Sequence, residues 1–514
     1  MTTTPTRSGT PYRSMLHPAR ASFGRLLHAE WTKFRTVRAW TLVLAVAAVV
    51  TVLVCLLGAN GSTTSGGGHD TLGPDGKEVV DVFRYTHRPL TGDGTVTARV
   101  TGLKSADGRT LEPWAKAGLL VKRNLTPGSA YAAVLATPAH GVRVQWNYTH
   151  DTAASDTDVT TTPRWLRLTR TGDHVTAYES PDGRTWKKIE DVRLPGLPNT
   201  VQVGLFVGTP AHEDVRRAFG GTSETYAGGQ ATGTFDHLAL QGTSTSGDWA
   251  GTDMGPAAPD GPVAENAPPA GTTTVSASGT YTLTGHGDIA PAQDGPDTVQ
   301  MSFQGVFFAV LFMVALGTLF VTGEYKRGLI RTTFTATPAR LKVLAAKTVV
   351  ITAVTFVTGL AAVAVGFTIA QHALRGNGFK PPEFPDLSVL DSPALRAVVG
   401  SAMLLSLVAV LALALGVVLR NSAGTIATVV VLVILPQILS FAFPLPAAQW
   451  LLRVTPAAAF AVQQGVTRYP QVKYNCLPES GCYPLSPWNG LAVLAAYTAA
   501  ALLLAAWSLR RRDA

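Results

Sequence analysis

Six long apolar runs, almost free of charge, constrain the fold of this chain more than any other feature. They are residues 40–57, 299–322, 343–370, 395–419, 425–443 and 491–509. A helix needs about 20 apolar residues to cross about 30 Å of hydrocarbon, and each run is near that length or beyond it. Only Lys347 and Arg396, both close to the end of a run, interrupt them with charge. The sequence therefore predicts an α-helical polytopic membrane protein with six transmembrane helices.

Lysine and arginine residues flank these runs and predict their orientation. Cytoplasmic loops carry an excess of both residues, and outward loops are poorer in them. The residues expected to face the cytoplasm are Arg25, Lys33, Arg35 and Arg38 before the first run, Lys326, Arg327, Arg331, Arg340 and Lys342 after the second, Arg420 after the fourth, and Arg510, Arg511 and Arg512 after the sixth. We therefore expect a multi-pass protein of the plasma membrane with both termini cytoplasmic. The pI of about 9.5 follows from this topology, and no groove-reading motif supports binding of nucleic acid.

Residues 1–38 are predicted to be a cytoplasmic tail that ends in an amphipathic helix. Between residues 22 and 38 the apolar side chains share one helical stripe, formed by Phe23, Leu26, Leu27, Phe34 and Val37. Such a helix lies in the membrane interface, and here it leads directly into the first span at residues 39–58. The basic region before this span is long, and the apolar stretch exceeds the about 7 to 15 residues of a signal peptide. An uncleaved anchor is therefore favoured over a cleaved signal.

Between the first and second spans, the sequence changes to short alternating segments bounded by turn residues. Residues 59–79 and 243–298 are rich in small residues, Pro and Thr, and we expect them to be linkers. The segment at 80–242 contains nine predicted strands, at residues 95–103, 115–122, 131–136, 142–148, 166–170, 175–179, 185–189, 201–207 and 234–240. Asp182-Gly183, between two alternating runs, favours a hairpin. The pattern predicts an extracellular all-β sandwich inserted between helices 1 and 2.

Four segments of this insert carry a recognisable pattern: GTVTARVTGL, PWAKAGLLVKRN, HGVRVQWNYTHD and RWLRLTRTGDHVTAYESPDGRTWKKI. They resemble the concanavalin-A-like lectin and glucanase jelly roll over residues 80–241. The resemblance implies contact with a glycan or a cell-envelope polymer, although a fold alone establishes no ligand. The candidate glycan-binding residues are Arg143, Gln145 and Asn147 on one strand face, and the aromatic residues Trp165 and Tyr178. A solvated face, and packing under a neighbouring sheet, are the alternative interpretations of these two groups.

The sequence shows no pattern for catalysis or metal binding. A glucanase needs two carboxylates placed across the scissile bond. Glu179 and Glu190 lie near Asp182, but Asp182 belongs to a turn. The aspartates at 151–158 lack the spacing and the glycine of an EF-hand loop. The chain also has no HExxH, no His/Cys cluster and no GxSxG motif. We therefore predict no catalytic residue, and no metal or cofactor bound by this chain.

The three cysteines fit the same layout. Cys55 falls within the first span, where we expect it to be inert packing. Cys476 and Cys482 both fall in the last outward loop, where an oxidising compartment permits a disulfide. The small loop that they close would gain at most about 2 kcal/mol from chain entropy, which is enough to fix a loop beside the sixth span.

Several motifs flank the spans in a fixed order. HAEWTKFRTVRAW precedes the first span, GEYKRGLIRTTFTATPARLKVLAAK follows the second, LGVVLRNSAGTIA joins the fourth to the fifth, and SPWNG and RRRDA flank the sixth. Together they resemble the permease subunits of type-2 ABC exporters in their actinobacterial form, across all six spans. The resemblance implies a homodimer or heterodimer of permeases that works with a separate cytoplasmic ATPase subunit, which binds ATP and Mg. Substrates of this group include drugs, lipids and polysaccharides, and the sequence does not identify one.

The resemblance also implies where the ATPase docks. The candidate coupling residues are Glu324, Arg327, Gly328, Arg331, Pro338 and Arg340 after the second span, and Glu30, Lys33 and Arg35 in the connecting helix before the first. Topology and snorkelling account for part of the basic residues. Glu324 differs, because a carboxylate at the end of a span is costly unless it is paired or hydrated. Arg327 and Arg331 lie at i+3 and i+7 from it, so one salt-linked helix face is feasible.

The source of energy separates the candidate functions. The chain has no GxxxxGK[ST] phosphate loop, so ATP hydrolysis would come from a partner chain. An ion-driven carrier would place ionisable groups within its spans, and these spans have almost none. The competing function is a membrane-anchored carbohydrate-binding or sensor protein without transport, for which one span would suffice. A tethered glycan hydrolase lacks its carboxylate pair. The large outer insert departs from compact members of the group and predicts that the cargo or its regulator is met outside the cell.

Overall fold

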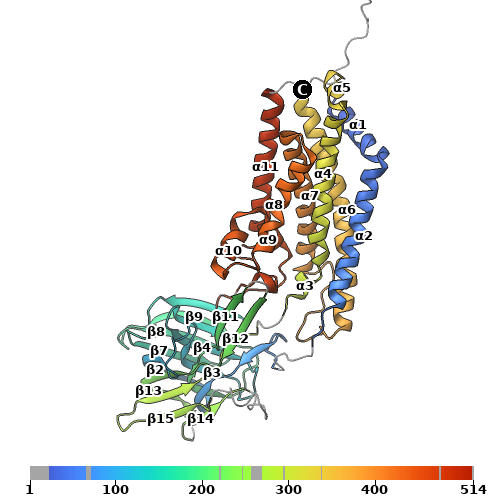
Figure 1. Ribbon diagram of the computed structural model, residues 1–514. Coiled ribbons are helices and arrows are strands. Elements are labelled where there is room, and N and C mark those ends of the chain that lie inside the picture. The colour runs from blue at the N-terminus through green and yellow to red at the C-terminus, as the bar shows by residue number, and fades with distance from the viewer. Residues whose placement is uncertain are drawn as a thin grey trace, which may run out of the picture.

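The computed structural model describes residues 22–511 apart from 65–70, 219–220, 246, 256–268, 293–295, 337–338 and 474–475. It consists of a bundle of long helices with a β-domain at one end (Figure 1). The start of α1 and the end of α11 lie at the opposite end of the bundle. We call that end the distal end, and the end next to the β-domain the proximal end.

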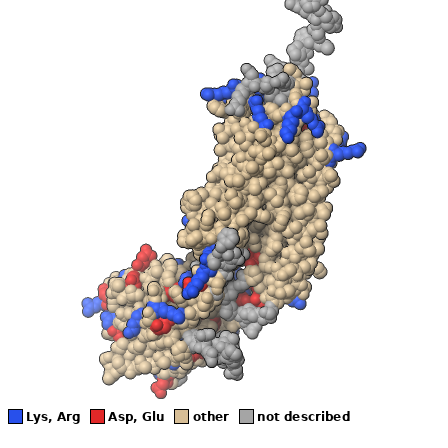
Figure 2. Space-filling view, in the orientation of Figure 1, with Lys and Arg blue, Asp and Glu red and all other residues tan. Residues whose placement is uncertain are grey.

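Six helical segments of the described chain are long and apolar enough to cross a membrane. They are α2 (Arg38–Asn60), α4 (Gln304–Lys326), α6 (Arg340–Gly376), α7 (Ala394–Leu419), α8 with α9 (Ser422–Leu439) and α11 (Pro487–Arg511). Each overlaps one of the six predicted apolar runs. Figure 2 shows Lys and Arg gathered at the distal end, and below them a surface of the bundle that is largely free of charge. These features indicate association with a membrane.

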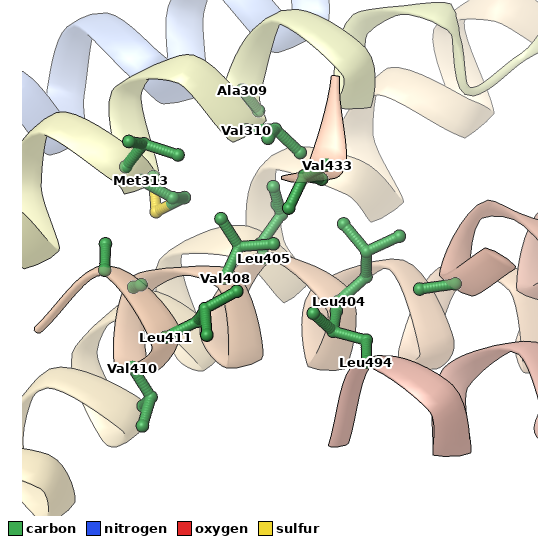
Figure 3. Close-up of a cluster of buried hydrophobic side chains, with 14 of the residues drawn as sticks. Ala309, Val310, Met313, Leu404, Leu405, Val408, Val410, Leu411, Val433 and Leu494 are labelled. Atoms are coloured by element: carbon green, nitrogen blue, oxygen red, sulfur yellow. The ribbon is translucent and has the colours of Figure 1, made fainter. Parts of the chain in front are cut away.

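The centre of the bundle is formed by α4 and α7. About two thirds of the most apolar stretch of each is buried, 67% in α4 and 72% in α7. Figure 3 shows side chains of α4, among them Val310 and Met313, facing Leu405 on α7. Gly317 lets the two helices approach closely, because a Cβ there would lie 2.1 Å from the carbonyl oxygen of Ala409. The outer helix α2, by contrast, exposes a full apolar stripe, at Leu42, Val46, Val49, Leu53 and Leu57.

The segment after the fifth span differs from the prediction. The predicted run 425–443 is not one continuous helix. It contains most of α8 (Ser422–Val433) and the separate short helix α9 (Leu435–Leu439). Pro436 interrupts the helix because proline has no amide hydrogen to donate. Two further helices follow where the sequence predicted only a loop: α10 (Leu445–Val454) and the 3-10 helix η2 (Pro456–Gln463). Every residue of η2 is buried, and the helix packs against α7 and α11. Small residues in its sequence, PAAAFAVQ, allow this close packing.

The β-domain is built on one 13-stranded sheet that folds over itself. Its strands are β2 (Arg84–Ser105), β3 (Lys116–Lys122), β4 (Tyr131–Thr137), β5 (Gly141–Trp146), β6 (His150–Ser155), β7 (Arg164–Thr171), β8 (His174–Ser180), β9 (Lys187–Arg193), β10 (Thr200–Gly208), β13 (Ala231–Thr245), β14 (Ala250–Asp253), β15 (Thr272–Val275) and β16 (Tyr281–Gly285). The long strand β2 makes the fold possible, because its first half pairs with β10 and its second half with β7. The two layers enclose one apolar core, which includes Val144, Leu166 and Leu205.

The nine predicted strands all overlap observed strands, and the structure has further strands that the pattern did not predict. The structure also has β1 (Val79–Asp81) paired with β17 (Ile289–Pro291), and the hairpin of β11 (His212–Ala218) and β12 (Gly221–Ala227). The region predicted as the linker 243–298 contains β14 to β17 and the short helix α3 (Thr298–Met301). Thr-rich segments such as TTTV have strand propensity without apolar alternation, which explains why the pattern missed them.

Candidate functional site

Four charged side chains meet at the distal end of the bundle. The Lys347 ammonium on α6 lies 2.7 Å from Glu324 Oε1 on α4 and 2.8 Å from Glu30 Oε2 on α1 (Phe23–Thr36). Lys33, also on α1, lies 3.2 Å from Glu30 Oε1 and 3.3 Å from Glu324 Oε1. We call Glu30, Lys33, Glu324 and Lys347 the charge cluster. It joins the amphipathic helix to two of the long apolar helices.

Three members of the charge cluster are withdrawn from solvent. The exposed fractions of Lys347, Glu30 and Glu324 are 2%, 3% and 6%. Burying one unpaired ion is very costly, whereas this set has two positive and two negative charges and is neutral as a whole. Lys33 is partly exposed, and its burial alone would lower its pKa; the charges of Glu30 and Glu324 outweigh this effect and raise the pKa. The helices can therefore separate here only by leaving buried charges unpaired.

Aromatic side chains enclose the charge cluster on its apolar side. The Phe34 ring lies 5.8 Å from that of Phe320, and the Trp40 ring lies 5.0 Å from Phe320 between centroids. The Lys347 ammonium lies 4.8 Å from the Phe320 centroid, close enough for a cation–π contact. Phe34 follows Glu30 by four residues, so helical geometry places both on the buried face of α1. The same α1 residues thus supply the ionic and the apolar contact.

The charge cluster brings together residues that the sequence singled out separately. Glu30, Lys33 and Glu324 were candidates on different segments, and the structure places them in one site. Lys347 was noted only as a charge near the end of a span. Its position in the sequence could have predicted a buried ion pair, because a lysine inside an apolar run is costly unless it has a partner.

Of the two arginines considered as partners of Glu324, the structure tests Arg327 and does not pair it with this carboxylate. Arg327 is exposed at the C-cap of α4, and the carboxylate of Glu324 instead binds the lysines of α1 and α6. Spacing along one helix could not reveal these partners, because they lie 291 and 23 residues away in the chain. Arg331 lies in α5 (Leu329–Ala336), and its side chain is outside the described atoms, as is the whole of Pro338.

The remaining coupling candidates lie around the charge cluster at the distal end. Gly328 has a φ of +69°, which a residue with a side chain rarely adopts, and it allows the chain to turn from α4 into α5. The Arg340 guanidinium at the start of α6 donates a 3.1 Å hydrogen bond to the carbonyl of Leu509 in α11. Arg35 is exposed on α1. The short helix α5 therefore lies in the chain between the end of α4 and the start of α6, both of which are bonded to the bundle.

The turn between α7 and α8 fixes the end of α4 from the other side. Arg420 adopts a left-handed conformation with a φ of +52°, and the Asn421 side chain caps α8 by accepting from two backbone amides. The Arg420 guanidinium lies 5.2 Å from the centroid of the Tyr325 ring, and the hydroxyls of Thr322 and Ser422 are 2.9 Å apart. This explains the LRNSAG motif structurally: it holds the α4 segment that carries Glu324.

The two groups of candidate glycan-binding residues lie on different layers of the β-domain. Val144 on β5 and Leu166 on β7 point into the same core, so their alternate neighbours lie on the other faces of the two layers. On β5 that other face lies against a second buried apolar cluster, which includes Leu135, and Gln145 is only 1% exposed. Arg143 and Gln145 both bind Asp151, and the backbone amide of Tyr131 donates to Asn147 Oδ1 at 3.3 Å. Trp165 on the other layer lies beside Arg99 and His237, and Tyr178 is half-buried on that same layer. They cannot form a single site.

The last loop of the bundle holds the β-domain at the proximal end. A disulfide joins Cys476 to Cys482, and the Arg468 guanidinium lies 2.8 Å from Cys482 Sγ. From this loop, Lys473 forms a 2.9 Å salt bridge with Glu112 of the β-domain, and the Gln471 amide donates to the carbonyl of Tyr148 at 3.1 Å. The loop before α11 therefore contacts the β-domain directly through ionic and polar bonds.

A buried aspartate joins the same loop to the start of α4. The Asp297 carboxylate caps α3 and also accepts hydrogen bonds from the amides of Gly465 and Val466. Burial raises the pKa of this carboxyl above its usual range. The proximal ends of α4 and α11 and the β-domain are thus bonded to one loop. No group of three or more His, Cys, Asp or Glu side chains able to hold a metal ion occurs in the described part of the chain.

Comparison with known proteins gives little further guidance. No protein-family model matches the chain, and the search of curated proteins gave no significant match. A solved structure of a functionally unknown protein from Saccharomyces cerevisiae is 16% identical, covering 31% of this chain and 74% of that chain, with a TM-score of 0.21. Scytalido-glutamic peptidase with a peptide-based transition state analog, and SCP-B of the eqolisin peptidases with the tripeptide Ala-Ile-His, are each 9% identical, covering 39% of this chain and 98% of theirs, with TM-scores of 0.23. Similarity at this level supports no conclusion about function.

We predict that the charge cluster stabilises the bundle as a unit. Lys347→Met leaves two buried carboxylates with only the half-exposed Lys33, and we expect the free energy of unfolding to fall by about 3–5 kcal/mol. Adding Glu324→Gln restores neutrality through the Glu30–Lys33 pair and should recover part of the loss. Denaturant unfolding of the purified protein measures both. The matched control is Lys342→Met, which removes an exposed lysine from the same helix. Equal effects of the two lysine substitutions would contradict this account.

Proposed function

We propose that this chain is the membrane-spanning permease subunit of an ABC exporter, driven by ATP that a separate cytoplasmic subunit hydrolyses. In this proposal the distal end of the bundle faces the cytoplasm, the β-domain is extracellular, and two permease copies, identical or different, form the transport unit. The single observation that carries the proposal is the charge cluster, because it connects exposed distal helices to the centre of the bundle.

The charge cluster offers a short path for force. α1 is an amphipathic surface helix, and α5 follows directly after the Glu324 end of α4. A partner that moves α1 displaces Glu30 and Lys33, and a partner that moves α5 displaces Glu324 at the end of α4. Because these side chains are bonded to each other, either movement is passed to the other helix. Since α4 is among the most buried helices, its displacement rearranges the core against α7. A protein that uses its helices only as an anchor has no need for such a connection.

The proximal contacts extend this path to the β-domain. Asp297 and the disulfide-closed loop connect the starts of α4 and α11 to each other, and Lys473 connects the loop to Glu112. Movement of either helix therefore reaches the β-domain. We propose that this domain binds a glycan or cell-envelope polymer and steers or gates release of the cargo. Trp165 and Tyr178 are the better candidates for such contact, since Arg143 and Gln145 of the other group both bind Asp151, and Gln145 is buried.

The partner ATPase is tested by purification. We expect the tagged protein, extracted in mild detergent from its native cells, to carry a polypeptide with a GxxxxGK[ST] loop in stoichiometric amount. Glu324→Ala should lose that polypeptide, or lose stimulation of its ATP hydrolysis by the permease, because the end of α4 is no longer fixed. Lys380→Ala, an exposed substitution in the loop after α6, is the control. A wild-type protein that is monodisperse and carries no ATPase contradicts the transporter proposal and favours an anchored carbohydrate-binding protein.

The independence of the β-domain gives a second test. The amide of Ala292 donates to the carbonyl of Glu78 at 3.1 Å, so the chain enters and leaves the domain at one point. Deleting residues 79–291 joins two atoms that are already neighbours, and we expect membrane insertion and ATPase association to remain. Membrane fractionation and co-purification measure the two properties. Loss of both would show that the domain is needed for assembly rather than for handling of cargo.

A further inference from the structure

An apolar groove lies between the amphipathic helix and the third long helix at the distal end. Its volume is about 560 Å³. The lining side chains are Leu27, His28 and Trp31 from α1, and Val349, Ala353 and Val357 among those from α6. Trp31 and Val357 expose 44% and 65% of their surface, so the groove is open on the outside of the bundle. This is a recess in the apolar surface rather than a closed core cavity.

Basic side chains lie along the α1 edge of the groove. His28, Trp31 and Arg35 are spaced three and four residues apart, so they share one side of α1. All three are exposed, whereas Glu30 and Phe34 face the bundle. The edge of the groove therefore combines an aromatic ring with positive charge, and the groove below it offers only apolar walls and one threonine, Thr358.

This combination matches the two parts of a phospholipid. An acyl chain suits the apolar walls, and an anionic headgroup complements the Arg35 guanidinium and the His28 ring at the level where tryptophan prefers to lie. We propose that the groove between α1 and α6 binds a phospholipid with an anionic headgroup from the leaflet at the distal end. The inference requires that the helices span a bilayer, and it does not depend on transport or on an ATPase.

The bound lipid would lie beside the charge cluster. Val350, which lines the groove, follows Lys347 by three residues on α6, and Trp31 follows Glu30 on α1. The Trp31 ring also stacks on Phe34, with centroids 6.5 Å apart. A lipid in the groove therefore fills the space between the same two helices that the cluster joins, and its presence sets how closely α1 can approach α6.

Trp31 provides the reporter for the test. The purified full-length protein is reconstituted into bilayers that contain a fixed fraction of lipid with brominated acyl chains, carried either by an anionic phosphatidylglycerol or by a zwitterionic phosphatidylcholine. The difference in fluorescence quenching between wild type and Trp31→Phe isolates the Trp31 signal from the other nine tryptophans. We expect the anionic brominated lipid to quench Trp31 more strongly, and Arg35→Gln to reduce this preference about fivefold, since one surface charge contributes about a factor of five in binding.

The control removes the same charge from the same end of the bundle. Arg510→Gln lies on α11, away from the groove, and should leave the Trp31 preference unchanged. Raising the salt concentration should weaken the preference in wild type, because the headgroup contact is exposed to screening. Equal quenching by the two brominated lipids would overturn the proposal in favour of an unselective annular lipid. Absence of quenching by either lipid would also overturn it, because no acyl chain then reaches the groove.

Discussion

The ionic contact between Lys347 and two carboxylates from other helices is the constraint on which the distal half of this structure depends. A single buried charge is costly. Helices that each carry one buried charged side chain can therefore pack together only where their charges pair with each other. Glu30, Glu324 and Lys347 satisfy that condition across α1, α4 and α6. The aromatic contacts of Phe34 and Phe320 then exclude water from the same place. A surface helix is in this way tied to the centre of the bundle.

Polar bonds join the helices at both ends of the bundle, and the middle of the bundle is apolar. At the proximal end, one loop is bonded to Asp297, to the disulfide and to Glu112 of the β-domain. Between the two ends the helices α4 and α7 pack through small and aliphatic residues without ionic contacts in their middle. Polar bonds thus fix the ends, while the centre is held by non-directional packing, which allows helices to shift relative to each other. In the proposed exporter, this division permits a movement at one end to reach the other.

The periodicity of the sequence predicted the elements well and their contacts poorly. Six apolar runs and nine alternating segments all correspond to observed helices and strands, because each signal is local. The strands in the Thr-rich region after residue 245 were missed, since their partners supply what their own sequence lacks. Glu324 could be recognised as unusual from its position at the end of a span. Its partners on α1 and α6 could not, because nothing in the spacing around Glu324 indicates which distant lysine will face it.

The central claim is that Glu30 and Lys347 act together to pass force between the amphipathic helix and the bundle. A double-mutant cycle on ATP turnover by the purified complex, with Glu30→Gln, Lys347→Met and the double variant, tests it most directly. Our account predicts strong coupling, with each single variant losing nearly as much stimulated turnover as the double variant. Independent effects, in which the fold-losses of the two single variants multiply in the double, would contradict it.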